Sequence, residues 1–149
     1  GVSQVLPALV QAFYAPRGST VWMEQPEIHL HPMAQSNLAD VFISAVNSYE
    51  DGEPRNMQLI VETHSEHFLT RLQRRVAEEA IDTKDVAIYF VNRNGAAADM
   101  EALRLNMFGE IENWPPNFFG DEMGDIAART MAALQRQAAA SAASAAQRS

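Results

Sequence analysis

The sequence predicts an α/β fold whose core is a parallel sheet. Short apolar runs typical of buried strands alternate with longer segments of helical periodicity, in the order strand, helix, strand, helix, strand. The chain has 149 residues, 47% of them hydrophobic, and is long enough to bury a core of its own. Because helices connect the first strands, we expect these strands to be parallel, with right-handed crossovers.

A helix, a strand and a second helix are predicted at the start of the chain. Apolar side chains recur at helical spacing over residues 3–15, where Ser3 can cap the helix. Residues 20–24, TVWME, are mostly apolar and predict a strand covered on both faces. Pro32 suits the first turn of the second helix, and residues 47–56 predict a polar loop after it.

A second strand and a third helix follow, and then a hairpin. Residues 57–63, MQLIVET, predict the second strand, and Ser65 can cap the helix that comes after it. Residues 85–92 predict a third strand, which a turn joins to a partner strand over residues 100–106. We expect one further helix beyond this hairpin.

The chain is expected to divide into three parts. Residues 1–94 form the main domain, residues 95–137 an extension, and residues 138–149 a low-complexity tail that is disordered or a frayed helix. Aromatic side chains of the extension are expected to pin it onto the domain; they are Trp114, Phe118 and Phe119.

Composition excludes several classes of function. The chain has no cysteine, which rules out disulfides, thiolate metal sites and a cysteine nucleophile. Its net charge of −8 disfavours broad binding to phosphate backbones. No apolar run approaches the roughly 20 residues of a membrane span, so we expect a cytoplasmic protein without a membrane partner. Three arginines share one side of a predicted helix, either as a solvated face or for an acidic partner: Arg71, Arg74 and Arg75.

Polar side chains gather where the first two strands end. Glu24, Gln25 and Glu27 follow the first strand, while Glu62 and His64 end or follow the second. Ligands of parallel sheets bind at the carboxyl ends of the strands, so neighbouring strands would bring these groups into one site. There Glu24 is placed to hold Mg²⁺, and His64 to donate a hydrogen bond to a terminal phosphate oxygen.

Three segments resemble motifs of ABC-type ATPases, in that family's order and near its spacing. TVWMEQPEIHLHP is similar to the Walker B strand and the loop after it, LIVETHSEH to the strand of the switch histidine, and GVSQVLP to the signature segment. The resemblance is strongest to bacterial AAA-family ATPases akin to the OLD type, which have a Glu-Gln-Pro-Glu Walker B and a short C-terminal region of unknown function. ENWPPNFFGDE resembles that region, so the likeness extends to about Glu122.

The resemblance implies a fold and a set of catalytic roles. Residues 1–94 would be the C-terminal half of a P-loop NTPase domain that uses Mg²⁺ with ATP, and Glu24 would be the carboxylate on the metal side. Gln25 falls where most ABC enzymes have a catalytic glutamate. Since an amide cannot take a proton as a carboxylate does, Gln25 would orient the attacking water, and the base would be Glu27, another group or the phosphate itself. His64 would be the switch histidine.

A homodimer of the full-length protein around ATP is implied as well. The signature segment would contact the nucleotide of the opposite protomer, and the loop after Walker B would cross the interface. The residues concerned are Gly1, Ser3 and Gln4 for the signature, and His29 and His31 for the loop. Closure of the dimer would control an effector protein or a nucleic acid.

A phosphate-binding loop is missing from this resemblance. No G-x-x-x-x-G-K-[S/T] pattern occurs, and the only lysine, Lys84, has no glycine-rich turn near it. Because the sequence opens at Gly1 within the signature-like segment, we expect a C-terminal fragment of a longer ATPase. Alone, it is expected neither to bind ATP tightly nor to hydrolyse it.

Two other functions fit parts of the sequence. A metal-dependent hydrolase or nuclease could combine the carboxylates with four histidines, His29, His31, His64 and His67. A non-catalytic interaction module would bind a partner through its sheet edge or its aromatic loop. Stoichiometric metal that survives dialysis would favour the first function, and a lack of ATPase activity after the upstream half is restored would favour the second.

Overall fold

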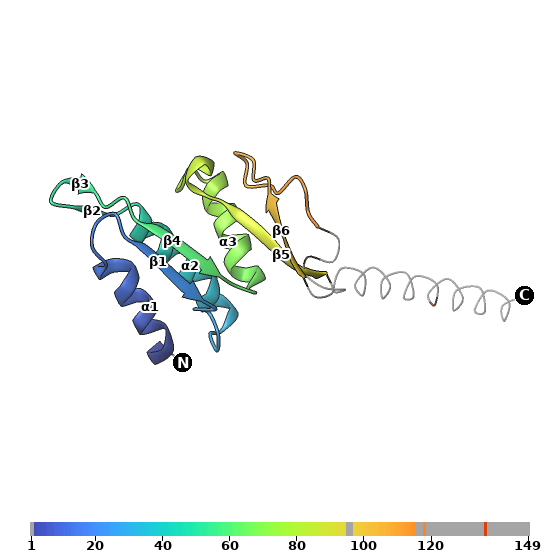
Figure 1. Ribbon diagram of the computed structural model, residues 1–149, viewed down its shortest axis with the longest axis horizontal. Helices are drawn as coiled ribbons and strands as arrows, with labels where there is room; N and C mark the ends of the chain where they lie inside the picture. The colour runs from blue at the N-terminus through green and yellow to red at the C-terminus, as the bar shows by residue number, and fades with distance from the viewer. Residues whose placement is uncertain (1, 95–96, 116–117, 119–135, 137–149) are drawn as a thin grey trace, which may run out of the picture. The chain divides into compact units, whose positions relative to one another are not determined.

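The computed structural model describes residues 2–94, 97–115, 118 and 136 of the chain (Figure 1). Two compact units make up the chain, residues 1–113 and residues 114–149. They differ from the predicted division after residues 94 and 137, which stays a prediction. The expected tail lies outside the described residues. Beyond residue 115 only residues 118 and 136 are described, so the expected further helix stays a prediction.

Two parallel strands form a sheet in the first unit. β1 pairs with β4 from Thr20 beside Gln58 to Glu24 beside Glu62 (Figure 1). Helix α2 lies between the two strands in the chain, and this crossover confirms the predicted parallel pairing. The elements of this layer are α1 (Val2–Tyr14), β1 (Thr20–Glu24), α2 (Pro32–Val46), β4 (Gln58–Glu62) and α3 (Glu66–Ala77).

Side chains cap two of the helices at their first turns. Pro32 occupies the first turn of α2 as predicted, and His31 Nδ1 accepts a hydrogen bond from the N–H of Met33 at 3.3 Å. At the start of α3, Ser65 Oγ accepts a hydrogen bond from the N–H of Phe68 at 3.0 Å, which confirms the predicted cap.

A small hairpin occupies the segment that was expected to be a loop. β2 (Tyr49–Glu50) pairs with β3 (Glu53–Pro54), and the turn residues Asp51 and Gly52 have φ angles of 53° and 81°, as two-residue hairpin turns require. Just after it, the buried guanidinium of Arg55 donates to two carbonyl oxygens at the end of α1, at 3.3 and 2.5 Å. Arg55 therefore satisfies carbonyls that the helix leaves open.

The core lies on one face of the β1/β4 sheet. Phe42 of α2 and Phe68 of α3 pack edge to face beside the inward-pointing Val21, with ring centroids 5.9 Å apart. On the opposite face Trp22 is 70% exposed and Ile60 is 42% exposed. The expectation that β1 is covered on both faces is therefore wrong, because successive side chains point to opposite faces and the helices pack against only one.

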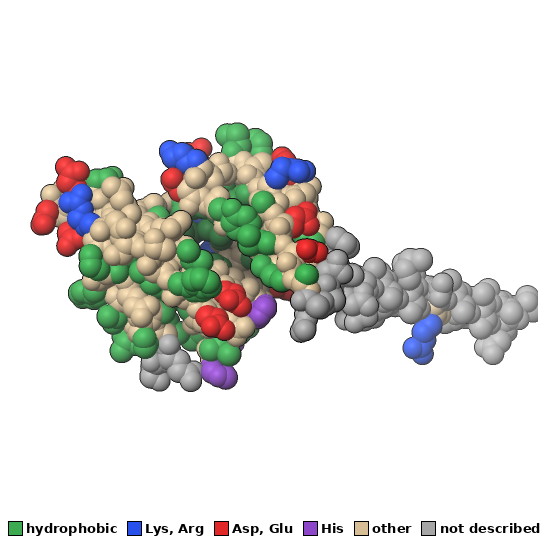
Figure 2. Space-filling view, viewed as in Figure 1, with side chains coloured by type: hydrophobic (Ala, Val, Ile, Leu, Met, Phe, Trp, Pro, Cys, Tyr) green, Lys and Arg blue, Asp and Glu red, His purple; other side chains and the backbone are tan. Residues whose placement is uncertain are grey.

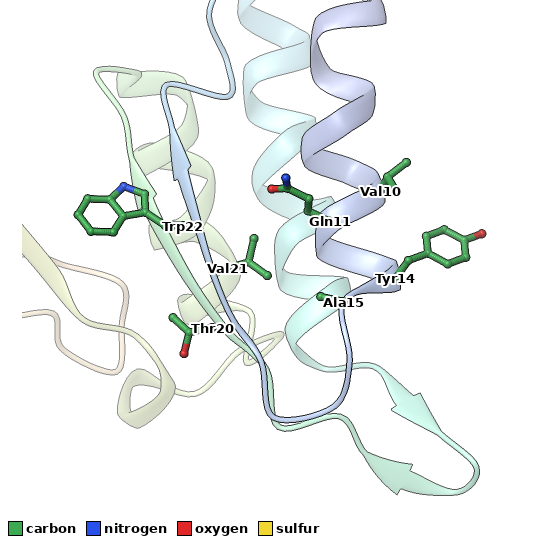
Figure 3. A pocket seen from close by; sticks show the side chains of 7 residues that line it. All are labelled: Val10, Gln11, Tyr14, Ala15, Thr20, Val21 and Trp22. Atoms are coloured by element: carbon green, nitrogen blue, oxygen red, sulfur yellow. The ribbon is translucent and has the colours of Figure 1, made fainter.

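A hollow of about 480 Å³ lies between the end of α1 and β1 (Figure 3). Val21 points from β1 toward α1, whereas Trp22 points away from it. Polar and apolar groups both line it, and the lining residues that the structure describes include no carboxylate and no histidine. It reaches Thr20, at the amino end of β1, so it lies at the opposite end of the strand from Glu24.

The predicted hairpin after α3 is present, with different strand bounds. β5 (Ile88–Asn94) pairs in antiparallel fashion with β6 (Ala97–Leu103), where residues 85–92 and 100–106 were expected. The first strand starts late because η1 (Thr83–Asp85) is a 3₁₀ turn. The second starts early because Asn94 and Ala97 already pair next to the turn.

The segment after this hairpin packs closely on α3. Gly109 has a φ of 78°, and a β-carbon at this position would lie 2.1 Å from the carbonyl oxygen of Gln73. Gln73 Nε2 donates to the carbonyl oxygen of Gly109 at 2.8 Å. A small core joins α2 and α3 to the segment that follows them; its buried members are Ile43, Val76 and Ile81.

Two of the aromatic side chains of the predicted extension contact each other. Trp114 and Phe118 pack edge to face with ring centroids 4.8 Å apart. Their docking onto the domain stays a prediction, and Phe119 lies outside the described residues. None of the described helices is long and apolar enough to cross a bilayer.

Candidate functional site

The polar strand ends lie side by side, as predicted. Glu24 and Glu62 are paired in register at the carboxyl ends of β1 and β4, and the N–H of Gln25 donates to the carbonyl oxygen of Glu62 at 2.7 Å. In a parallel pair, residues in register point to the same face, so both carboxylates leave the sheet on one side. Figure 2 shows acidic and histidine side chains gathered in this part of the surface.

Both carboxylates at the strand ends are available for a ligand. Glu24 and Glu62 are exposed, and neither forms an ion pair with another residue of the part that the structure describes. Two like charges about 5 Å apart on neighbouring strands repel each other unless a cation lies between or near them. Among the described residues, no three histidine, aspartate or glutamate side chains are grouped closely enough to hold a metal ion on their own.

The loop after β1 turns sharply. Gln25 and His29 have φ angles of 44° and 67°, in the left-handed region that costs a residue with a β-carbon about 1 kcal/mol or more. The N–H of Ile28 donates to the carbonyl oxygen of Gln25, and the N–H of Leu30 to that of Glu27, each at 3.0 Å. This winding leaves the Gln25 side chain half-buried beside the strand end and His29 exposed.

Glu27 reaches from this loop to the loop after β4. Its side chain is buried, and Oε1 accepts hydrogen bonds from the Thr63 hydroxyl at 2.6 Å and from the N–H of His64 at 3.0 Å. The other oxygen, Oε2, is buried and has no hydrogen-bond partner within the described part of the chain. Glu27 therefore joins the two polar segments.

A second connection between the loops comes from α2, and the sequence did not reveal it. Gln35 Oε1 accepts a hydrogen bond from the Ser65 hydroxyl at 2.6 Å, and Gln35 Nε2 donates to the carbonyl oxygen of Leu30 at 3.0 Å. The hydroxyl of Ser65 thus caps α3 and also contacts α2. Nothing in the local sequence marks Gln35, because Ser65 lies 30 residues away.

The histidines differ in how they are held. His64 and His67 have exposed side chains. Their backbones are held instead: the N–H of His64 donates to Glu27, and the carbonyl of His67 accepts from the hydroxyl of Ser36 at 3.3 Å. His31 uses Nδ1 to cap α2, which places the proton of its neutral ring on Nε2. His29 has an exposed side chain.

The signature-like residues lie at the start of α1. This helix begins at Val2, so Ser3 lies in its first turn rather than at the cap position before it. Gln4 follows in the same turn, and Gly1 lies outside the described residues. Their predicted contact with the nucleotide of an opposite protomer stays a prediction.

A separate charged cluster joins α2 to α3. Asp40 accepts hydrogen bonds from Arg71 at 2.5 Å and from Arg75 at 2.6 Å, while Arg74 and Arg75 both pair with Glu78. The hydrogen bond from Arg75 holds the pKa of Asp40 below its ordinary value, against the opposing effect of burial, and Arg71 contributes in the same direction. The three arginines are therefore engaged within the chain.

Two protein-family models match parts of the chain. Residues 1–69 match the AAA ATPase domain, and residues 81–128 match a family described as a protein of unknown function (DUF3696). No curated protein and no solved structure matches the chain. The first match contains Glu24, Gln25 and His64, and so it covers the candidate site. Together the two matches relate this chain to the AAA-family ATPases.

Proposed function

We propose that this chain carries part of the nucleotide site of an ABC-type AAA ATPase akin to the OLD type. One observation carries the proposal: two polar strand ends lie side by side within the segment that matches the AAA ATPase domain. Carboxyl ends of parallel strands are where sheets of this class bind their ligands. The AAA match supports a general ATPase-like function, and the finer assignment rests on the residues at these strand ends.

The carboxylates suit Mg²⁺ bound together with ATP. Mg²⁺ prefers oxygen ligands, keeps several waters and is usually held by one or two carboxylates plus phosphate oxygens. Glu24, with Glu62 in register beside it, offers that donor set on an exposed edge. When bound, Mg²⁺ neutralises the charge that develops on the transferred phosphoryl group. We assign Glu24 as the residue on the metal side.

Gln25 and His64 have separate tasks in this proposal. The amide of Gln25 orients the attacking water by hydrogen bonds but accepts no proton, so hydrolysis is expected to be slow. The exposed imidazole of His64 donates a hydrogen bond to a terminal phosphate oxygen, where negative charge is largest. The proton of the water then passes to the phosphate itself or to a group from elsewhere.

The remaining parts of the site come from outside these residues. No phosphate-loop pattern occurs in the 149 residues, so we propose that another segment of a longer protein supplies it. We also propose a homodimer around Mg-ATP, in which the first turn of α1 and the loop containing His29 and His31 contact the opposite protomer. Closure of this dimer would control an effector protein or a nucleic acid.

The roles assigned to Glu24 and His64 can be tested by steady-state ATP hydrolysis. The protein measured is a longer one that contains both a phosphate loop and these residues. Glu24→Gln is expected to lower kcat by at least about a hundredfold, and His64→Ala by about a hundredfold, because each removes stabilisation of charge in the transition state. Glu53→Ala, which removes an exposed carboxylate of β3, is the matched control and keeps the wild-type rate. Wild-type turnover in both site variants would remove the assignment of Glu24 and His64.

ATP binding to the 149-residue chain alone tests the need for an external phosphate loop. Isothermal titration with Mg-ATP is expected to show no micromolar affinity, and tight binding would contradict the proposal. The alternative of a metal-dependent hydrolase is not favoured, since the described histidines and carboxylates form no group of three suited to a metal ion. If the longer protein with its phosphate loop hydrolyses no ATP, the hypothesis of a non-catalytic interaction module is favoured instead.

A further inference from the structure

The buried carboxylate of Glu27 makes contacts that favour a positioning role over that of a general base. A base must come within hydrogen-bond reach of the proton that it takes. The side chain of Glu27 is only 5% exposed, and Oε1 already accepts hydrogen bonds from the Thr63 hydroxyl and from the N–H of His64. Both contacts are to the loop after β4, one to a side-chain hydroxyl and one to a backbone N–H.

We propose that Glu27 is a positioning residue for His64. By holding the Thr63 hydroxyl and the N–H of His64 on one oxygen, it fixes the backbone from which the imidazole extends, and thereby the place of that imidazole relative to Glu24. The catalytic consequence of this inference rests on the proposed ATPase function, whereas the contact between Glu27 and His64 does not.

The unpartnered oxygen of Glu27 makes a glutamine an informative replacement. Both donors converge on Oε1, which the amide oxygen of glutamine reproduces, and Oε2 has no described partner to lose. A positioning role therefore survives Glu27→Gln. A proton-accepting role does not, because an amide cannot act as a base at neutral pH.

The connection through Gln35 keeps the loops together when Glu27 is changed. Gln35 joins Ser65 to Leu30 through hydrogen bonds of 2.6 and 3.0 Å, and neither involves Glu27. The parallel pairing of β1 with β4 is also independent of this side chain. We therefore expect Glu27→Ala to fold, with its effect confined to the segment at Thr63 and His64.

Amide hydrogen exchange in the 149-residue chain tests the contact without nucleotide. Glu27→Ala is expected to accelerate exchange at the His64 amide by about fivefold or more, the effect of losing one hydrogen bond, while the amides of the β1/β4 ladder keep their rates. Glu27→Gln and the control Glu53→Ala are expected to stay within about twofold of wild type at His64. Unchanged exchange in Glu27→Ala, or equal acceleration throughout β4, would overturn the proposal.

The catalytic consequence of positioning His64 is tested by the kinetics of ATP hydrolysis in the longer protein that includes a phosphate loop. Glu27→Gln is expected to keep kcat within about threefold of wild type, whereas Glu27→Ala lowers kcat by about tenfold with little change in KM for Mg-ATP. If the Glu27→Gln variant hydrolyses no ATP while its His64 amide stays protected from exchange, the carboxylate of Glu27 takes part in the reaction and the positioning role is overturned. This test holds even if Glu27→Ala fails to fold. If the wild type hydrolyses no ATP, the proposed function fails, and the exchange experiment still decides the contact.

Discussion

Glu27 and Asp40 both tie distant segments of the first unit together, but they do so by different physics. Asp40 is partly exposed and faces two guanidinium groups, so each of its oxygens meets a positive charge. Glu27 is buried, and among the described residues it accepts hydrogen bonds only from neutral donors, all on one of its two oxygens. From this difference we expect Asp40 to contribute mainly to stability, and Glu27 mainly to the placement of the segment at Thr63 and His64.

The largest loss of stability is expected at Gly109, which packs against α3, the helix that also carries the arginine partners of Asp40. Gly109→Ala would place a β-carbon 2.1 Å from the carbonyl oxygen of Gln73 and would strain a φ of 78°. We expect a loss of about 3 kcal/mol in unfolding free energy, measured by urea denaturation, with the His64 amide unaffected until global unfolding.

Gly18→Ala is the matched control for this substitution. Gly18 has a similar φ of 71°, but a β-carbon there would meet nothing within 4 Å. Strain alone is expected to cost about 1 kcal/mol at this position. Equal losses in the two variants would show that packing against α3 has no part in the effect at Gly109.

Converting Asp40 to an amide removes its ion pairs with Arg71 and Arg75. Asp40→Asn is expected to lower the unfolding free energy by about 1 kcal/mol near neutral pH, since two guanidinium groups lose their partner. The folded pKa of Asp40 lies below its ordinary value of 3.8, so the contribution is present above that pH and disappears as the pH falls through the lower folded pKa. Urea denaturation at neutral pH and below pH 3.8 should therefore show the two proteins converging in acid.

The same chemical change at Glu27 sharpens the contrast. Glu27→Gln is expected to change the unfolding free energy by less than about 0.5 kcal/mol, because the hydrogen bonds weakened by loss of the charge are offset by the smaller cost of burying a neutral amide. The comparison with Asp40→Asn uses the same denaturation measurement at the same pH. A loss as large as that of Asp40→Asn would mean that the charge of Glu27 stabilises the fold, and the distinction between the two carboxylates would fall.

Arg74 should give the smallest effect. Its side chain is 61% exposed, and its partner Glu78 keeps a second ion pair with Arg75. Water and salt screen such a surface pair, so Arg74→Gln is expected to leave the denaturation midpoint unchanged at physiological ionic strength. A clear loss that persists in high salt would show that Arg74 contributes through packing instead.

Local signals in the sequence predicted much of this fold. Pro32 marks a helix start by its position in the first turn, and Ser65 marks one by a contact within three residues; both starts occur where they were expected. The rule that ligands gather at the carboxyl ends of parallel strands brought Glu24 and His64 to one edge, and the pairing of β1 with β4 places them there. Their proposed roles remain to be tested.

Long-range side-chain contacts could not be predicted in the same way. Glu27 and His64 are 37 residues apart, and Gln35 and Ser65 are 30 apart, so no spacing in the chain indicates that they meet. The exposed face of β1 was missed because an apolar run predicts burial but does not tell how many layers cover it. Here Trp22 lies on a face that the helices leave open.

That open face carries its own optical reporter. The chain has two tryptophans, and Trp22 is 70% exposed on the strand that ends at Glu24. The fluorescence emission of indole moves to shorter wavelengths when water is removed from the ring. The emission of Trp22 would therefore report the binding of another surface to this face of the sheet, with no added label. Replacing Trp114 by phenylalanine would leave the whole signal to Trp22. The emission of Trp22 could then report burial of the open face, while hydrogen exchange at the His64 amide reports order at the carboxyl end of the same sheet.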